Sequence, residues 1–335
     1  MGANRFVAAS ALALSCIGAL FVSEPSRAAE YGHGAYLLGF GGPGAGIAPP
    51  PGVYFTNFTW FYNGSAGRDV SLPFGQQVAA GVNANAQIDI PILTWSTPVQ
   101  ILGGNLGFSA MLPIGRTAVG ATATTVPPLP PVSASRRDTV FTFGDPALVA
   151  SLGWHSGNFH WAAMVTGFFP LGDYDKSSLA NIALHRLAGD VSGALTWLDP
   201  TLGLNLTVVA GVTFNAENTA TDYKTGNEFH IEWSATKNLT QQFSIGLVGY
   251  YYRQFTADSG PGATLGPFKG EVTALGGTMG YNFMVGQTPV ATNVRVYREF
   301  NVTHRLQGTA GIFTLAIPLQ VAQTPPSPAT KMVTK

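Results

Sequence analysis

The sequence predicts an all-β protein, a transmembrane antiparallel β-barrel of about 12 strands of the outer-membrane type. Polar and apolar residues alternate strictly in several segments, which is the period of a β-strand. Charged residues make up only 10% of the 335 residues, whereas a typical soluble domain has roughly 25%. No later segment has 18 or more continuously apolar residues, which argues against helical spans. A closed barrel is the other fold that pairs every backbone group within a bilayer.

Residues 1–29 are predicted to form a secretory signal peptide that is cleaved. Arg5 precedes an apolar run, and small residues follow it near Ala28 and Ala29. The alternative is a retained membrane anchor, but the run is short for a span, and the small residues favour cleavage.

The only cysteine, Cys16, lies within this run. A lipoprotein signal is the weaker alternative, because Ala13 stands where a large aliphatic residue is usual. After cleavage near Ala29 the mature chain has no cysteine, so neither a disulfide nor a cysteine-ligated metal site is expected.

Residues 30–52 are rich in glycine and proline, which argues against a helix or a central strand. We expect an irregular segment that is either periplasmic or a hatch that folds into the lumen. The barrel itself is expected over 53–319, and residues 320–335 read as a disordered tail.

The predicted strands are runs rich in β-branched and aromatic residues, bounded by Gly, Pro, Asn and Asp. Their number is even, as in single-chain bacterial outer-membrane barrels. They are expected at 53–63, 76–92, 99–113, 146–156, 158–170, 187–198, 202–215, 227–237, 241–255, 270–282, 289–300 and 304–317.

The predicted connections alternate in length, as they do between the periplasmic and outer ends of such barrels. The 300–304 connection is a short exception. A soluble β-sandwich is the alternative, since its hairpins need not alternate. Short turns are expected at 96–98, 156–158, 199–201 and 238–240, and long loops at 64–75, 114–145, 171–186, 216–226 and 257–270.

The polar face of each strand is predicted to line the lumen, because the apolar face of a membrane barrel contacts lipid. In 228–236, Glu228, His230 and Glu232 share one face, opposite Phe229 and Ile231. The same rule assigns further side chains to the lumen and the substrate path: Asn83, Asn85, Asp89, Asn205, Tyr250, Tyr252, Arg295 and Glu299.

Tyr250 and Tyr252 are candidates for contact with aromatic solutes, because a tyrosine ring stacks on an apolar molecule while its hydroxyl stays hydrated. The alternative is an aromatic girdle at the membrane interface, and a bulge near Gly249 would reverse their direction. Girdle residues are expected where aromatic side chains gather near strand ends. These are Tyr54, Phe58, Trp60, Tyr62, Trp95, Trp154, Trp197 and Trp233.

Enzyme motifs are missing from the sequence: it has no G-x-S-x-G elbow, no glycine-rich phosphate loop and no H-E-x-x-H. His230 with Glu228 and Glu232 resembles a metal or acid/base site, but pairing with arginines across the lumen is the favoured interpretation. Arg295 and Glu299 share a face and are the expected partners in such a network. We therefore expect no catalytic residues, no metal and no cofactor. The 17 acidic and 17 basic residues also give no field that favours nucleic acid.

Several segments, in order along the chain, resemble the Phenol_MetA_deg family of outer-membrane proteins, named for the meta-cleavage pathway of phenol degradation. The resemblance implies a transporter-like β-barrel for hydrophobic or aromatic compounds and carries over no catalytic residues. One departure is the polar tail after "IFTLAIPL", since such barrels usually end on a strand with a terminal aromatic residue. The segments are 31–55, "FGDP" (143–146), "FFPLGDYD" (168–175), 217–230, 249–260 and "YREF" (297–300).

The predicted function is uptake of small hydrophobic or aromatic compounds across the outer membrane. One alternative is an outer-membrane enzyme that acts on lipid, for which no nucleophile with a neighbouring base is found. The other is a structural or adhesion barrel, which would depend on the 114–145 loop.

Overall fold

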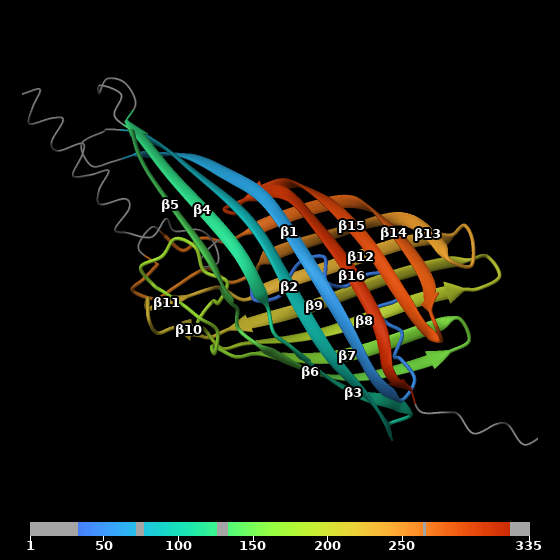
Figure 1. The fold of residues 1–335 in the computed structure, drawn as a ribbon. Coiled ribbons are helices and arrows are strands. Elements are labelled where there is room, and N and C mark those ends of the chain that lie inside the picture. Colours follow the sequence, from blue (N-terminus) through green and yellow to red (C-terminus); the bar gives the residue numbers. More distant parts are fainter. Residues whose placement is uncertain (1–32, 72–76, 126–132, 264–265, 322–335) are drawn as a thin grey trace, which may run out of the picture.

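The chain folds into a closed antiparallel β-barrel, as predicted (Figure 1). The computed structural model describes residues 33–71, 77–125, 133–263 and 266–321. Fourteen strands form one sheet, which closes because β1 pairs with both β16 and β2. The strands are β1 (Gly52–Ser71), β2 (Gln77–Ile101), β3 (Gly104–Met111), β4 (Ile114–Thr125), β5 (Ser133–Phe143), β6 (Ala147–Ser156), β7 (Phe159–Phe168), β8 (Ala188–Asp199), β9 (Leu204–Asn215), β10 (Glu217–Asn218), β11 (Tyr223–Lys224), β12 (Glu228–Asn238), β13 (Phe243–Gln254), β14 (Glu271–Val285), β15 (Thr288–Thr303) and β16 (Gln307–Val321).

These strands occupy twelve positions around the barrel, the predicted number. β3 and β4 pair with successive stretches of β2, so they follow one another in line. β6 and β5 pair with β3 and β4 in the same way. The short breaks at 112–113 and 144–146 each contain a proline, which cannot donate to the ladder.

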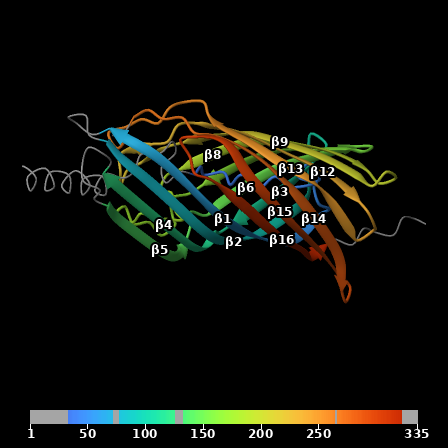
Figure 2. The same ribbon diagram turned by 90° about the horizontal axis from the view of Figure 1, so that it is seen from above.

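The two ends of the barrel differ in their connections (Figures 1 and 2). At the end we call the turn end, the reversals are short, and four carry a glycine with positive φ: Gly103, Gly157, Gly203 and Gly286. β1 begins and β16 ends there. The other end, the loop end, holds the connections 169–187, 216–227 and 255–270, the second of which contains the small β10–β11 hairpin. The alternation of short and long connections follows from this arrangement.

The prediction of a long loop at 114–145 is wrong, because most of this stretch forms β4 and β5. The strand signal of β4 is weak, since Gly, Ala and Thr dominate it, and pairing with β2 and β5 supplies the stabilisation that its side chains do not. The segment "VPPLPP" (126–131) lies outside the described residues.

The expected turn at 96–98 is also wrong. This stretch lies within β2, where the register with β3 shifts between Ser96 and Gln100. A shift of this kind accommodates Pro98, and the chain reverses instead at Leu102 and Gly103, both with positive φ. The expected loop at 64–75 is shorter than predicted as well, because β1 continues to Ser71.

The outer surface is largely apolar. Exposed side chains include Val165, Val191, Leu195 and Leu206 on neighbouring strands β7, β8 and β9. Such a surface fits contact with lipid, and a closed barrel with an apolar exterior is the architecture of the outer membrane. The described residues contain no helix that is long and apolar enough to cross a membrane.

The aromatic girdle is confirmed only in part. Trp95 is 53% exposed near the turn end of β2, and Trp154 stacks on Trp161 at the turn end of β6 and β7. Phe58 and Trp60, by contrast, point into the barrel and line its cavity, as does Tyr62. Proximity to a strand end does not determine which face of the sheet a ring occupies.

Candidate functional site

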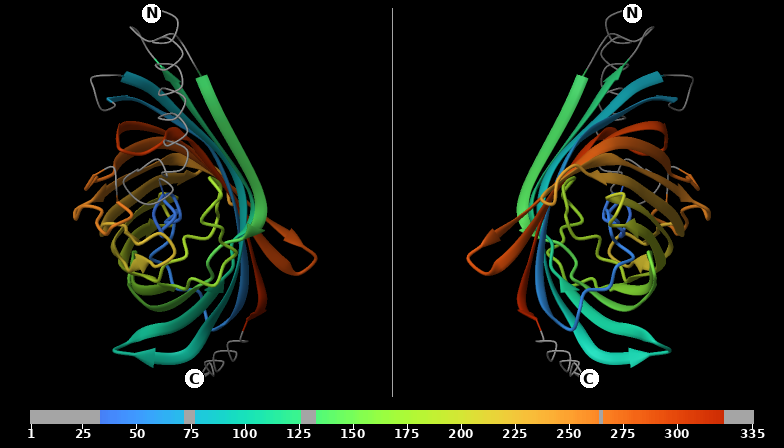
Figure 3. Two further views of the ribbon diagram at one scale, coloured as in Figure 1. Left: turned by 90° about the vertical axis from the view of Figure 1, so that its left-hand side faces the viewer. Right: turned by 90° about the vertical axis from the view of Figure 1, so that its right-hand side faces the viewer.

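A segment of the chain runs through the lumen along the barrel, and we call residues 33–51 the strap (Figure 3). It falls within the glycine- and proline-rich segment of the sequence. Near the loop end the strap passes beside Glu228, the first residue of β12. Near the turn end the hydroxyl of Ser96 donates to the carbonyl of Pro49 at 2.8 Å. The strap then continues into β1.

Two buried charged side chains hold the middle of the strap through its backbone. The carboxylate of Glu232 accepts the amides of Gly39, at 2.7 Å, and Gly41, at 2.5 Å. The guanidinium of Arg295 donates to the carbonyl of Gly39 at 2.7 Å. Both charged side chains are 2% exposed. Hydrogen bonds to charged groups are stronger than neutral ones, so this contact fixes the strap in register with the wall.

The strap is glycine-rich because the wall approaches its backbone closely. A Cβ on Gly41 would lie 2.6 Å from Oε2 of Glu232 and 2.8 Å from Cγ2 of Val209. Gly39 has a φ of +87°, a conformation that other residues rarely adopt. A side chain at either position would displace the strap or the charged groups that bind it.

His230 forms a buried pair that the sequence analysis missed. Its Nε2 lies 2.9 Å from Oδ2 of Asp190 on β8, and the two side chains are 1% and 0% exposed. The hydroxyl of Thr213 donates to the same oxygen at 2.7 Å. Tyr36 of the strap stacks on the His230 ring at 3.7 Å between centroids. Asp190 lies on the polar face of β8, so the alternation rule would have identified it.

The charged residues around His230 have partners within the protein. Within the described ranges, no group of three or more His, Cys, Asp or Glu side chains could hold an ion. Glu232 binds the strap, and His230 binds Asp190. The expected pairing of these residues with arginines takes the form of Glu232 and Arg295 on opposite sides of the strap backbone.

Beside the strap lies a cavity of about 710 Å³. Its walls are mostly apolar where they come from β1, β2, β3, β6 and β7, although Thr56, Thr94, Ser109, Ser151 and Thr166 also line them. Phe40 of the strap stacks on Phe58 beside the cavity, with ring centroids 4.4 Å apart. The apolar wall consists of Phe58, Trp60, Ile88, Ile90, Ile92, Met111, Val149, Met164 and Phe168. The lumen is therefore divided: its polar side binds the strap, and its apolar side encloses the cavity.

Asn83, Asn85 and Asp89 do not face the lumen, and this prediction is corrected. The side chains of Ile88 and Ile90 line the cavity, so those of opposite parity on β2 point outward. Asp89 accepts hydrogen bonds on the outer face from Asn57 at 3.2 Å and Thr59 at 2.6 Å. The alternation rule assumes a wet lumen and fails here, because the interior beside β2 is itself apolar.

The remaining predicted residues lie inside the barrel. Asn205 accepts from Thr207 at 2.8 Å, and Glu228 is 1% exposed. Tyr250 and Tyr252 are each 2% exposed, and β13 pairs without a register shift at Gly249, so no bulge reverses them. A role of these side chains along a solute path stays a prediction.

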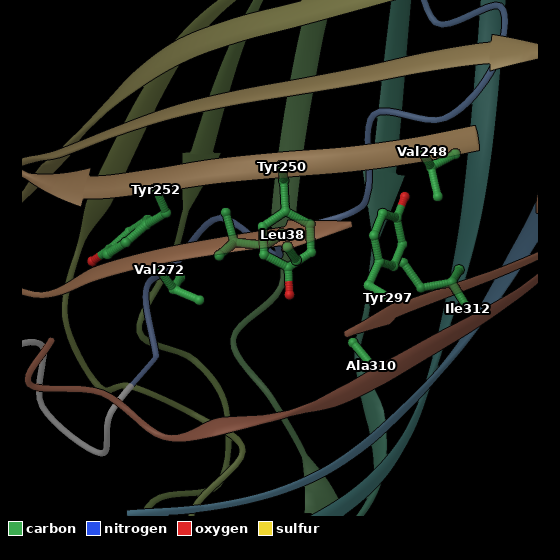
Figure 4. Close-up of a cluster of buried hydrophobic side chains, with 9 residues drawn as sticks. Leu38, Val248, Tyr250, Tyr252, Val272, Tyr297, Ala310 and Ile312 are labelled. Atoms are coloured by element: carbon green, nitrogen blue, oxygen red, sulfur yellow. The ribbon is translucent and has the colours of Figure 1, made fainter. Parts of the chain in front are cut away.

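Tyr250 belongs to a buried cluster that packs the strap against the wall (Figure 4). Leu38 of the strap lies among inward side chains of β13 to β16, including Tyr252, Tyr297 and Ile312. The hydroxyl of Tyr250 donates to Glu299 at 2.9 Å. Glu299 also accepts hydrogen bonds from the hydroxyl of Tyr62 and the amide of Gly308. Its carboxylate is therefore hydrogen-bonded within this cluster, instead of to Arg295 as expected.

The connection 169–187 closes part of the loop end. Ala180 and Ala183 are fully buried, and Asp145 accepts amides of Gly172, at 3.0 Å, and Leu184, at 2.7 Å. The family segments "FGDP" and "FFPLGDYD" thus meet in space. In the same connection, hydrogen bonds from the hydroxyl and the amide of Ser177 lower the pKa of Asp175.

Comparison with known proteins supports the fold. Residues 52–315 match the family model described as "Putative MetA-pathway of phenol degradation". The COG4313 outer membrane channel from Pseudomonas putida F1 is similar in structure, with 14% identity, 82% of this chain and 98% of that chain covered, and a TM-score of 0.65. A Pseudomonas aeruginosa FadL homologue gives 13% identity, coverage of 83% and 92%, and a TM-score of 0.41. Among curated proteins no match to the chain is found.

Proposed function

The chain belongs to the Phenol_MetA_deg family, and we propose that it is an outer-membrane channel for small hydrophobic or aromatic compounds. The apolar wall of the cavity is the observation that carries this proposal. A cavity of about 710 Å³ lies within the range of sites for small organic ligands, roughly 300–1,000 Å³.

The chemistry of the wall favours apolar solutes over polar ones. Isoleucine, methionine and phenylalanine side chains offer a solute no hydrogen bonds, so a sugar that entered would lose its contacts with water. An aromatic solute loses little and gains contact with rings such as Phe40, Phe58 and Trp60.

The extent of the cavity supports passage rather than storage. Arg305 and Leu306, in the connection between β15 and β16, line it at the loop end. Asn282 and Ala291, beside the short β14–β15 turn, line it at the turn end. Space lined by residues from both ends is what a solute needs to cross beside the strap.

Neither alternative function gains support. An enzyme that acts on lipid would need an activated nucleophile on the outer face, and the hydroxyl of Thr59, which donates there to Asp89, shares that carboxylate oxygen with the side chain of Asn57. An adhesion barrel would depend on a long loop at 114–145, and that stretch consists largely of β4 and β5.

The proposal is tested by measuring uptake in cells that lack the chain and in the same cells complemented with a copy of it. Labelled phenol and toluene should enter faster with the chain than without it, and glucose should not. Ile90→Asn, in the cavity wall, should slow toluene uptake several-fold, while Asp89→Asn, on the outer face, should leave it unchanged. Equal toluene uptake with and without the chain would refute the proposal.

A further inference from the structure

The strap has a direction that follows from its contacts. It joins β1 at Gly52, which lies at the turn end. From Gly52 back toward residue 33, the strap contacts wall residues that lie successively farther from the turn end. In order these contacts are Pro49 with Ser96, Ala48 with Gly153, Gly46 with Thr196, Gly44 with Thr207, Gly41 and Gly39 with Glu232, Tyr36 with His230, and Gly34 with Glu228.

β12 shows which end this series reaches. The strand begins with Glu228 at the loop end and finishes with Asn238, just before the short turn to β13. Tyr36 contacts His230 and Gly41 contacts Glu232, so the strap descends in the same direction as β12. The N-terminal part of the strap therefore lies at the loop end, opposite to the end where β1 begins.

Outer-membrane barrels place their short turns in the periplasm and their long loops at the cell surface. We propose that the strap enters the lumen from the cell surface, while β16 ends on the periplasmic side. This inference goes beyond the proposed function and holds whatever solute the cavity takes.

The arrangement has a consequence for assembly. The strap is continuous with β1, and β1 closes the barrel by pairing with both β16 and β2. The strap must therefore lie in the lumen when this closure forms, because afterwards its end would have to thread the whole barrel.

Single cysteines test the topology without background, because Cys16 is the only cysteine and lies in the predicted signal peptide. Tyr31→Cys probes the chain just before the strap. Lys176→Cys marks an exposed position in the long 169–187 connection, and Gln287→Cys marks the short turn between β14 and β15. Intact cells are treated with a membrane-impermeant maleimide. The label is then measured on the folded barrel, recognised by its heat-modifiable mobility on gels, after cleavage of the predicted signal peptide.

The expected result is that Tyr31→Cys and Lys176→Cys are labelled in intact cells, whereas Gln287→Cys is labelled only after permeabilisation. Labelling of Tyr31→Cys only after permeabilisation overturns the proposal. So does the reverse pattern at Lys176 and Gln287. An epitope inserted between Glu30 and Tyr31 gives an independent reading: antibody binding to intact cells is expected, and binding to permeabilised cells alone would contradict it.

Discussion

Glu232 and Arg295, on β12 and β15, bind opposite sides of one glycine. The carboxylate accepts the amide of Gly39, and the guanidinium donates to its carbonyl, each at 2.7 Å. Two buried opposite charges thus satisfy each other through a strap peptide rather than by direct contact. A buried charge is costly unless it is hydrogen-bonded, so the strap and the two charges stabilise one another.

Glu232→Gln should loosen the strap. The amide keeps one acceptor but turns an N–H toward the amide of Gly41, which leaves that donor and the charge of Arg295 uncompensated. We expect a loss of about 1–3 kcal/mol in the free energy of unfolding and faster proteolytic cleavage within 33–51. Glu271→Gln, at a partly exposed ion pair with Arg253, is the matched control and should change neither. Equal rates of proteolytic cleavage of the strap in the two variants would show that Glu232 does not hold it.

Ile231→Arg should destabilise the barrel in lipid. Ile231 points away from the lumen, because His230 and Glu232 on either side of it are buried inside. An arginine on the lipid face costs roughly 2–4 kcal/mol near the bilayer midplane. Denaturant titration in vesicles against Ile231→Leu measures the difference. Identical midpoints would mean that this face does not contact lipid.

Tyr250→Phe should cost less than Tyr250→Ala. The first removes only the hydrogen bond to Glu299, and Glu299 keeps Tyr62 and the amide of Gly308, so we expect a loss of about 1 kcal/mol. The second empties a buried site among Leu38 and Tyr297, which costs roughly 3–5 kcal/mol. Thermal unfolding of both variants checks this order. A stable Tyr250→Ala variant with altered uptake would instead support the predicted solute-contact role.

A disulfide between the strap and the wall should leave transport unchanged, because the cavity runs beside the strap. A Cβ on Gly41 would lie 3.1 Å from that of Val209, close to the roughly 3.5–4.5 Å of a disulfide. Because a side chain at Gly41 displaces the strap in either redox state, the double variant Gly41→Cys, Val209→Cys is compared only with itself, once oxidised and once reduced. Equal toluene uptake in both forms is expected. Uptake that stops on oxidation and returns on reduction would show that the strap must move.

The sequence by itself determined the barrel. Its evidence was repeated alternation, low charge, and turns that alternate with loops, all of which act locally along each strand. On β12 it also assigned the faces correctly, because lipid lies outside and the charged side chains bind one another and the strap inside. The glycine content of 31–52 marked an irregular segment, although it did not say where that segment runs.

Only the tertiary structure decided what fills the lumen. The outward position of Asp89 follows from the apolar cavity behind Ile88 and Ile90, and alternation is the same whether water or an apolar wall lies inside. The pairing of His230 with Asp190 joins residues 40 positions apart on strands separated by β9. The strap binds through backbone atoms of glycines, which carry no side-chain signal. A local pattern reports the polarity of two faces, whereas the medium that each face meets depends on the whole closed barrel and on the chain within it.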